Sequence, residues 1–181
     1  MAKLFKYINR NISIIMIIVV EVRGRQAAVR NAVDIIGKAL SLSGLYAQGV
    51  LTYNNGFVGY VKADKAMILS RQPECPDFLL CIDESVDIKH AMAGIKEKGI
   101  AILNAREKPA FPVIKNKKIK PYVIDATGMS MALPKKPKPY FALLGIFTKL
   151  CGTVSMKSMK TLLPDKESSA LFDEGYKAVK S

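Results

Sequence analysis

Residues 14–44 read IIMIIVVEVRGRQAAVRNAVDIIGKALSLSG, and this stretch decides the fold that the sequence predicts. Its first part, Ile14–Val22, is apolar and rich in β-branched residues, which is typical of a strand buried on both faces of a parallel sheet. The next part, Gln26–Ser43, places apolar residues at helical spacing, and Gly44 behind it is a common helix stop. The opening is therefore predicted to be a strand, a short glycine-containing turn and a helix.

A second strand–helix–strand unit follows further along the chain. Asp77–Ile82 and Gly99–Asn104 are predicted strands, and Ser85–Lys98 between them is a predicted helix with Ser85 as its N-cap. Strands that alternate with helices favour a parallel sheet with right-handed crossovers. For the remaining segments, the predictions are a loop at Gln48–Gly59, a short strand at Ala66–Ser70, a loop or hairpin at Lys108–Lys120 and a strand at Tyr122–Ala126. Three helices are predicted after them, at Tyr140–Cys151, Ser155–Leu163 and Asp165–Val179.

These elements define the predicted fold class. It is α/β: a single Rossmann-like domain with a mainly parallel sheet, flanking helices and a helical C-terminal end. The chain has 181 residues, half of them hydrophobic and 24% charged, which excludes a disordered chain, a collagen-like repeat and a disulfide-dense mini-protein. Its longest apolar run, Ile12–Val20, is shorter than the ~20 residues of a membrane-spanning helix, so we expect no membrane association. Charged residues follow this run in place of a small-residue cleavage site, which argues against a secretory signal.

The three cysteines, Cys75, Cys81 and Cys151, are odd in number and far apart. Their spacing fits neither a disulfide framework nor the Cys-x-x-Cys pairs of a zinc or iron–sulfur site. Isolated thiols are typical of a reducing compartment, so we expect a cytoplasmic protein. Any metal cluster that takes part in electron transfer is then expected on another chain.

The formal net charge is +13, from 28 basic and 15 acidic residues. A charge of this size raises nucleic acid as a partner. However, the basic segment at residues 106–138 contains only Phe111 and Tyr122 as aromatic residues and no basic stripe at helical spacing. Proteins that bind single strands interleave aromatic and basic side chains so that bases can stack. The segment therefore favours a solvated loop or a docking face for an acidic protein over nucleic acid.

The turn after the first strand is where open α/β sheets usually bind ligands, because the helix behind it offers free N–H groups. It reads Arg23-Gly24-Arg25-Gln26, with one glycine where a dinucleotide site needs Gly-x-Gly-x-x-Gly. The two arginines offer charge-assisted contacts to a phosphate or carboxylate instead. Two hypotheses stay open. Either Arg23 and Gln26 line the functional face while Arg25 replaces backbone recognition by side-chain recognition, or the turn is an ordinary connector with Arg25 in solvent.

Other polar residues predict no complete active site. His90 is the only histidine, and the chain has neither the second histidine or cysteine pair of a zinc site nor the Gly-x-Ser-x-Gly elbow of a serine hydrolase. Asp83 and Asp125 each end a predicted strand, where helix capping is the expected role. The chain is therefore expected to hold no catalytic residues and no metal of its own.

Several short motifs occur in an order known from one enzyme family. They read GLYAQ, DFLLCID, GIAILN, VIDAT and LGIFTKLCGTVS, at residues 44–48, 77–83, 99–104, 123–127 and 144–155. In this order the chain resembles the gamma subunit of 2-oxoacid:ferredoxin oxidoreductases, from about residue 17 to residue 179. The family's Gly-Arg-Gly-Gly-Gln-Gly turn falls on Val22–Ala27, where Arg23, Gly24 and Gln26 match and three glycines are replaced.

This resemblance implies a subunit of a complex that decarboxylates a 2-oxoacid oxidatively with coenzyme A, giving acyl-CoA, carbon dioxide and reduced ferredoxin. It implies that this chain holds no cofactor, and that thiamine diphosphate, magnesium and iron–sulfur clusters belong to partner subunits of the alpha, beta and delta types. The isolated chain is then inactive, and residues 23–26 form a loop at the subunit interface or near coenzyme A.

Residues 1–15 are predicted to be an N-terminal extension, and residues 16–181 a gamma-type domain. The alternative function, which rests on the net charge of +13 together with Arg23, Arg25 and Arg30 around the predicted helix start, is a free-standing basic module that binds a phosphate ligand or nucleic acid.

Overall fold

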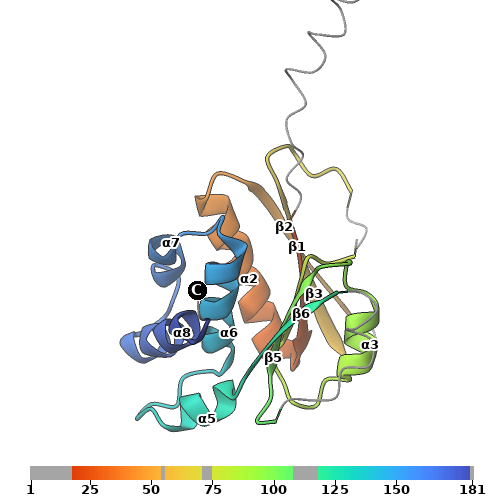
Figure 1. Cartoon of the computed structure of the whole chain (residues 1–181). Coiled ribbons are helices and arrows are strands. Elements are labelled where there is room, and N and C mark those ends of the chain that lie inside the picture. The colour runs from red at the N-terminus through yellow and green to blue at the C-terminus, as the bar shows by residue number, and fades with distance from the viewer. Residues whose placement is uncertain (1–17, 54–55, 71–74, 108–117, 180–181) are drawn as a thin grey trace, which may run out of the picture.

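Six strands form one sheet in the order β2-β3-β1-β4-β5-β6 in the computed structural model, which describes residues 18–53, 56–70, 75–107 and 118–179 (Figure 1). Four of them run parallel: β1 (Ile18–Gly24), β4 (Phe78–Cys81), β5 (Ile100–Asn104) and β6 (Lys120–Ile124). β3 (Phe57–Asp64) is antiparallel to β1 and to β2 (Tyr46–Tyr53), so a hairpin completes one edge. The predicted α/β fold with a mainly parallel sheet is confirmed.

Helices cover both faces of this sheet (Figure 1). One face carries four helices, which are α2 (Gln26–Leu42), α6 (Tyr140–Cys151), α7 (Met156–Lys160) and α8 (Lys166–Ala178). The other face carries α3 (Ile88–Ala93), and the short helix α5 (Ala126–Met131) follows β6 where the parallel strands end. The predicted flanking helices and the helical C-terminal end are confirmed as well.

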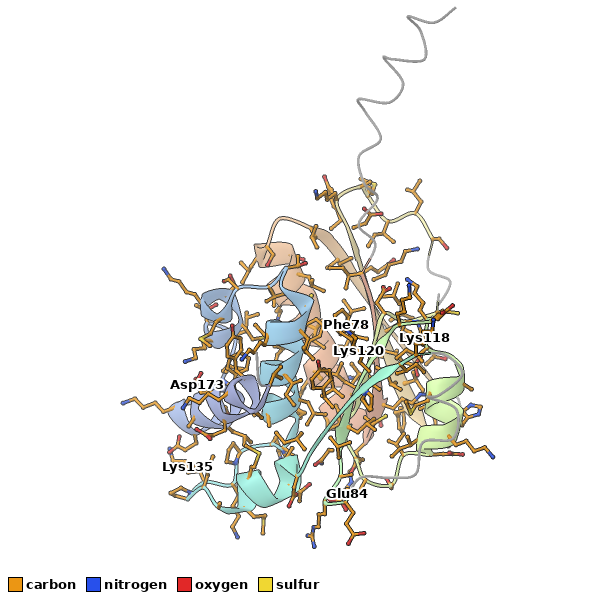
Figure 2. The ribbon with its side chains drawn as sticks, viewed as in Figure 1. Phe78, Glu84, Lys118, Lys120, Lys135 and Asp173 are labelled. Atoms are coloured by element: carbon orange, nitrogen blue, oxygen red, sulfur yellow. The ribbon has the colours of Figure 1, made fainter. Side chains whose placement is uncertain are left out.

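The main core lies between the sheet and α6. This helix is buried on all sides from Tyr140 to Thr148, as expected for a helix with apolar residues all round. Phe78 of β4 points into this layer (Figure 2), and its ring meets that of Phe147 edge to face at 5.2 Å between centroids. On the far side, α8 approaches so closely that a Cβ on Gly175 would overlap the carbonyl oxygen of Ala142.

Several predicted elements agree with the structure within one or two residues. The predicted helix Gln26–Ser43 is α2, the predicted strand Gly99–Asn104 is β5, and Tyr140–Cys151 is α6. The first predicted strand corresponds to β1, which reaches Gly24, two residues beyond the predicted end. Residues 14–17 of that strand, the predicted extension at residues 1–15 and most of the predicted loop or hairpin lie outside the described residues.

Two predictions between β1 and β4 were wrong. The predicted loop Gln48–Gly59 is instead mostly strand, because the β-branched and aromatic residues at Gln48–Tyr53 of β2 and Phe57–Gly59 of β3 pair with each other. The predicted strand Ala66–Ser70 has no regular structure and exposes Met67 and Leu69. A short apolar run without a neighbouring strand edge does not form a strand.

The helix predicted over Ser85–Lys98 was also too long. Residues 83–86 form a turn, and α3 begins only at Ile88, where the Asp87 carboxylate accepts the His90 N–H at 3.1 Å. The helix ends at Ala93 with Gly94 as its C-cap, and Lys98, which the prediction placed in the helix, has a positive φ of 64°. Among the described residues, no helix is both long and apolar enough to cross a membrane.

Candidate functional site

A crevice of about 350 Å³ opens where β1, β4 and β5 end and where α2, α5 and α6 begin. Ligands of open α/β sheets bind in this position, outside the carboxyl ends of the strands. Its lining combines small and apolar residues with polar ones from α2, β5, α5, α6 and the connections beside them. The polar members are Arg25, Asn31, Asp83, Asn104, Thr127, Lys138 and Tyr140.

Gly24 lets the end of β1 come close to the end of β4. Its φ is +152°, and a Cβ there would lie 3.2 Å from both Asp83 Oδ2 and Ile82 Cβ. Both the backbone angle and the lack of room favour glycine. The single glycine that the turn retains is therefore at the position where the structure requires one.

Asp83 fills the space in front of the α2 N-terminus. Its Oδ2 accepts the backbone N–H of Arg25 at 2.8 Å, and its Oδ1 lies 3.4 Å from the Arg25 Nε. A carboxylate in this place interacts favourably with the positive end of the helix. Asp83 thus places a carboxylate beside the start of α2, where it is bonded to the Arg25 N–H.

Asn104 holds the floor of the crevice together from the end of β5. Its amide nitrogen donates to the Ile82 carbonyl at 2.8 Å and to Thr127 Oγ1 at 2.9 Å, and its oxygen accepts the Thr127 N–H at 3.3 Å. The side chain is buried, so each of these bonds replaces one that water could make. Asn104 therefore ties the ends of β4 and β5 to the start of α5.

The start of α5 is further fixed by Asp125, as the sequence predicts for a residue that ends a strand. Its carboxylate accepts the Gly128 N–H at 2.7 Å as a helix cap. A Cβ on Gly128 would overlap this carboxylate, so the cap needs glycine in the helix. Asp125 is thereby engaged in capping α5.

The opposite wall of the crevice comes from α2 and α6. Tyr140 is buried, which raises the pKa of its hydroxyl, and it shares a hydrogen bond with Asn31 of α2. Lys138, one residue before the helix cap, is exposed and forms no ion pair within the described part of the chain. Arg25 and Lys138 together outnumber the single acid, Asp83, so the mouth of the crevice is basic.

The four residues predicted for the loop are not gathered in one place. Arg25 lines the crevice, and its side chain is 85% exposed. Gln26 is exposed at the start of α2 and lines a different hollow, beside Tyr53 and Phe57 of the hairpin. Gly24 borders a hollow of about 100 Å³ on the other face of the sheet.

Arg23 also lies on that other face, because side chains of a strand alternate between faces. It is 8% exposed, and its Nε donates to the buried Glu21 carboxylate, two residues back in β1. Burial of Tyr60, the negative charge of Glu21 and the hydrogen bond between these two side chains raise the pKa of the Tyr60 hydroxyl to about 12. Arg23 and Glu21 thus form a buried pair within the sheet, and only Arg25 of the two arginines faces the crevice.

The crevice has the chemistry of a binding site. Its amide and carboxylate groups are engaged in holding the walls, and its unengaged charge is cationic. No group of three or more histidine, cysteine or acidic side chains that could hold a metal occurs among the described residues. Cys81, the cysteine on β4, is fully buried, and burial raises its pKa to about 12, which suppresses the thiolate that a ligand or nucleophile needs. The Cys81 thiol is therefore poorly suited to bind a metal or to act as a nucleophile.

The sequence identified the turn and predicted helix capping for Asp83 and Asp125. Asp125 does cap α5, whereas the prediction for Asp83 was wrong, because Asp87 caps α3 and Asp83 accepts the Arg25 N–H instead. Asn104, Thr127 and the wall around Tyr140 were missed. Asn104 carried a signal, since a polar residue that ends an apolar strand lies at the edge where ligands bind. For Tyr140 no local signal exists, because α6 reaches the crevice only through tertiary packing.

Comparison with known proteins gives consistent matches over nearly the whole chain. The sequence profile described as "Pyruvate ferredoxin/flavodoxin oxidoreductase" matches residues 29–180. The "Pyruvate/ketoisovalerate oxidoreductases common subunit gamma" of Thermococcus kodakarensis is 31% identical over 166 residues, which are 86% of this chain and 89% of that protein.

Two solved structures share the fold. Pyruvate oxidoreductase subunit PORC from Thermotoga maritima superposes with a TM-score of 0.71 at 19% identity, covering 89% of this chain and 96% of that one. The gamma subunit of a keto/oxoacid ferredoxin oxidoreductase from Geobacter sulfurreducens gives a TM-score of 0.72 at 17% identity, over 89% and 94% of the two chains.

Proposed function

Because this chain belongs to the pyruvate ferredoxin/flavodoxin oxidoreductase family, we propose that it is the gamma subunit of a multi-subunit 2-oxoacid:ferredoxin oxidoreductase. The observation that carries this proposal is the match to a gamma subunit along 86% of the chain, together with the same fold in two further gamma-type subunits. The reaction of the complex is the oxidative decarboxylation of a 2-oxoacid with coenzyme A, which yields acyl-CoA, carbon dioxide and reduced ferredoxin.

In this proposal the redox chemistry belongs to other subunits. Thiamine diphosphate, magnesium and iron–sulfur clusters would be held by partners of the alpha, beta and delta types, and ferredoxin would dock on the complex. The separation of the cysteines supports this division of labour, since Cys75 is exposed, Cys81 is buried on β4 and Cys151 ends α6. The three free thiols also support a cytoplasmic location. The isolated chain is accordingly inactive.

We further propose that Arg23, Gly24, Arg25 and Gln26 form the loop where this subunit meets the rest of the complex or its coenzyme A. Gly24 determines the backbone path of the turn, and Arg23 anchors the start of the turn by its hydrogen bond to the Glu21 carboxylate. Arg25 and Lys138 at the mouth of the crevice recognise an anionic group by their side chains. Asp83 already accepts the Arg25 N–H at the start of the helix, so recognition shifts from this backbone group to these side chains.

Purification of the tagged chain from its host, at native expression level and with salt washes of about 0.5 M, tests the proposal. High salt removes partners that bind only by attraction to the net charge of +13. We expect thiamine diphosphate and iron–sulfur proteins to remain bound in fixed stoichiometry. If the chain is recovered alone, or with nucleic acid, the proposed function is wrong.

A further inference from the structure

The sheet has two edges in the described part of the chain, β2 and β6, and they are built differently. Strand edges present unpaired backbone groups, and proteins usually protect them with lysine, proline or short length. β6 follows this rule: it is five residues long and begins Lys120-Pro121. β2 has eight residues, YAQGVLTY, with no charged residue and no proline.

The hydrogen bonds of β1 determine which groups of β2 point outward. Val19 donates to the Asp77 carboxylate and accepts the Asp77 N–H, each at 2.8 Å, so odd-numbered residues of β1 face β4. Backbone groups of successive residues point to opposite sides of a strand, so the even-numbered residues of β1 face β3. The register pairs them with odd-numbered residues of β3, as in Val20 with Val61.

It follows that the even-numbered residues of β3 face β2, where they pair with even-numbered residues such as Val50 opposite Tyr60. The odd-numbered residues of β2 therefore direct both N–H and C=O away from the sheet. These residues are Ala47, Gly49, Leu51 and Tyr53.

The same reasoning shows why β6 is closed. Lys120 donates to the Gly99 carbonyl and Ile124 accepts the Ala105 N–H, each at 3.0 Å, so both face β5. Pro121 and Val123 face outward, and proline has no N–H to offer. β6 thus presents one outward N–H, against four on β2.

A groove runs along the open edge between β2 and α2. Its larger part, of about 690 Å³, is lined by Val33, Leu42, Ala47 and Leu51 among others, and a smaller part of about 270 Å³ shares Leu51 and Arg30 with it. Leu42 is 60% exposed and Leu51 is 43% exposed. Outward backbone groups beside an apolar groove are the two features that bind an extended peptide.

The charge beside the groove indicates the partner's chemistry. Arg30 of α2 borders both parts, is exposed, and forms no ion pair within the residues that the structure describes. Asp34, one turn further, is bound to Lys38 at 2.7 Å. An acidic group of a partner would form an ion pair with Arg30. A second copy of this chain would instead bring another +13 charge and another Arg30 to the same edge.

We propose that β2 is an assembly edge: an extended segment of a partner subunit adds a strand beside Tyr46–Tyr53, places apolar side chains in the groove and presents a carboxylate to Arg30. This inference rests on the proposed function, because it needs a partner subunit. It adds which surface binds that partner and by which backbone groups.

Amide hydrogen exchange, measured on the isolated chain and on the purified complex, tests the pairing directly. We expect exchange in Tyr46–Tyr53 to slow by at least about tenfold in the complex, while Lys120–Ile124 changes little. A complex that forms without this protection overturns the inference and leaves the proposed function standing. Absence of any complex overturns both. Protection in the isolated chain that grows with its concentration identifies a second copy as the occupant, and this also overturns the inference.

Two variants with matched controls test the contacts. Ala47→Pro removes one outward N–H and is expected to weaken binding of the purified partner subunits about five- to tenfold, whereas Ala47→Ser keeps that N–H and binds normally. Arg30→Glu is expected to weaken binding by a similar factor, and the control Lys89→Glu, on the other face of the sheet, leaves it unchanged. If Ala47→Pro does not fold, as judged by circular dichroism, Arg30→Glu decides. Equal binding by Arg30→Glu and Lys89→Glu contradicts the proposal.

Discussion

Replacement of Asn104 by alanine tests whether this residue holds the crevice together. The change removes two donated hydrogen bonds and one accepted one, at 2.8, 2.9 and 3.3 Å. Each hydrogen bond of a buried group contributes about 1 kcal/mol, so the free energy of unfolding should fall by about 3 kcal/mol. The Ile82 carbonyl and the Thr127 N–H lose their partner and cannot recover it from bulk water, because Asn104 is only 3% exposed.

Urea unfolding of the isolated chain measures this loss. With a slope of about 2 kcal/mol per M, the midpoint of unfolding should fall by about 1.5 M. Asn31→Ala is the matched control, since it removes a single hydrogen bond to Tyr140 from an exposed position in the same crevice. It should cost less than about 1 kcal/mol. Equal midpoint shifts for the two variants would refute the reasoning, because Asn104 would then contribute no more than a surface amide.

Three further predictions concern the core, the turn and the pH dependence. Gly175→Ala should destabilise the chain by about 2–3 kcal/mol in urea unfolding, because the added methyl group separates α8 from α6. Arg23→Ala should cost about 3–5 kcal/mol because it leaves Glu21 charged and buried without its partner, whereas Arg25→Gly should leave stability unchanged and weaken assembly of the complex. If Arg25→Gly assembles and supports activity normally, the turn is only a connector. The pKa of Cys81 is raised to about 12 in the folded chain, so between about pH 9 and pH 12 only the unfolded chain loses this thiol proton. The free energy of unfolding should therefore fall as the pH rises through this range, and it should fall less in the variant Cys81→Ala.

The elements that the sequence predicted best are those with a strong local pattern. Gln26–Leu42 has apolar residues at helical spacing and a glycine just beyond its end, and Tyr140–Cys151 follows a proline that permits only the first turn of a helix. β1 and β5 are continuous apolar runs, which is the pattern of central parallel strands. For these segments, local propensity and tertiary burial favour the same structure.

The elements that failed depend on partners elsewhere in the chain. The residues of β2 are mostly exposed, so they show no pattern of alternating burial, and β2 forms only because β3 offers its free edge. α3 starts three residues later than predicted because Asp87, and not Ser85, caps it. Ser85 lies instead in the turn that begins at Asp83. Such competition between neighbouring caps has no clear sequence signal.

The candidate site was only partly predictable for a related reason. The position of the turn follows from the strand–helix order, and the alternation of side chains along β1 already places Arg23 on the face of Glu21. A Glu-x-Arg spacing in a buried strand was thus an available signal for the internal ion pair. The wall formed by Lys138 and Tyr140 lies more than a hundred residues from the turn, and only the packing of α6 on the sheet brings it there.

The most direct test of the proposed function is the 2-oxoacid- and coenzyme A-dependent reduction of ferredoxin in extracts of the host with and without this chain. We expect the activity to be lost when the chain is deleted, to return when the purified chain is added to the remaining subunits, and to be absent from the chain alone. Full activity with every 2-oxoacid in extracts that lack the chain would contradict its role as the gamma subunit.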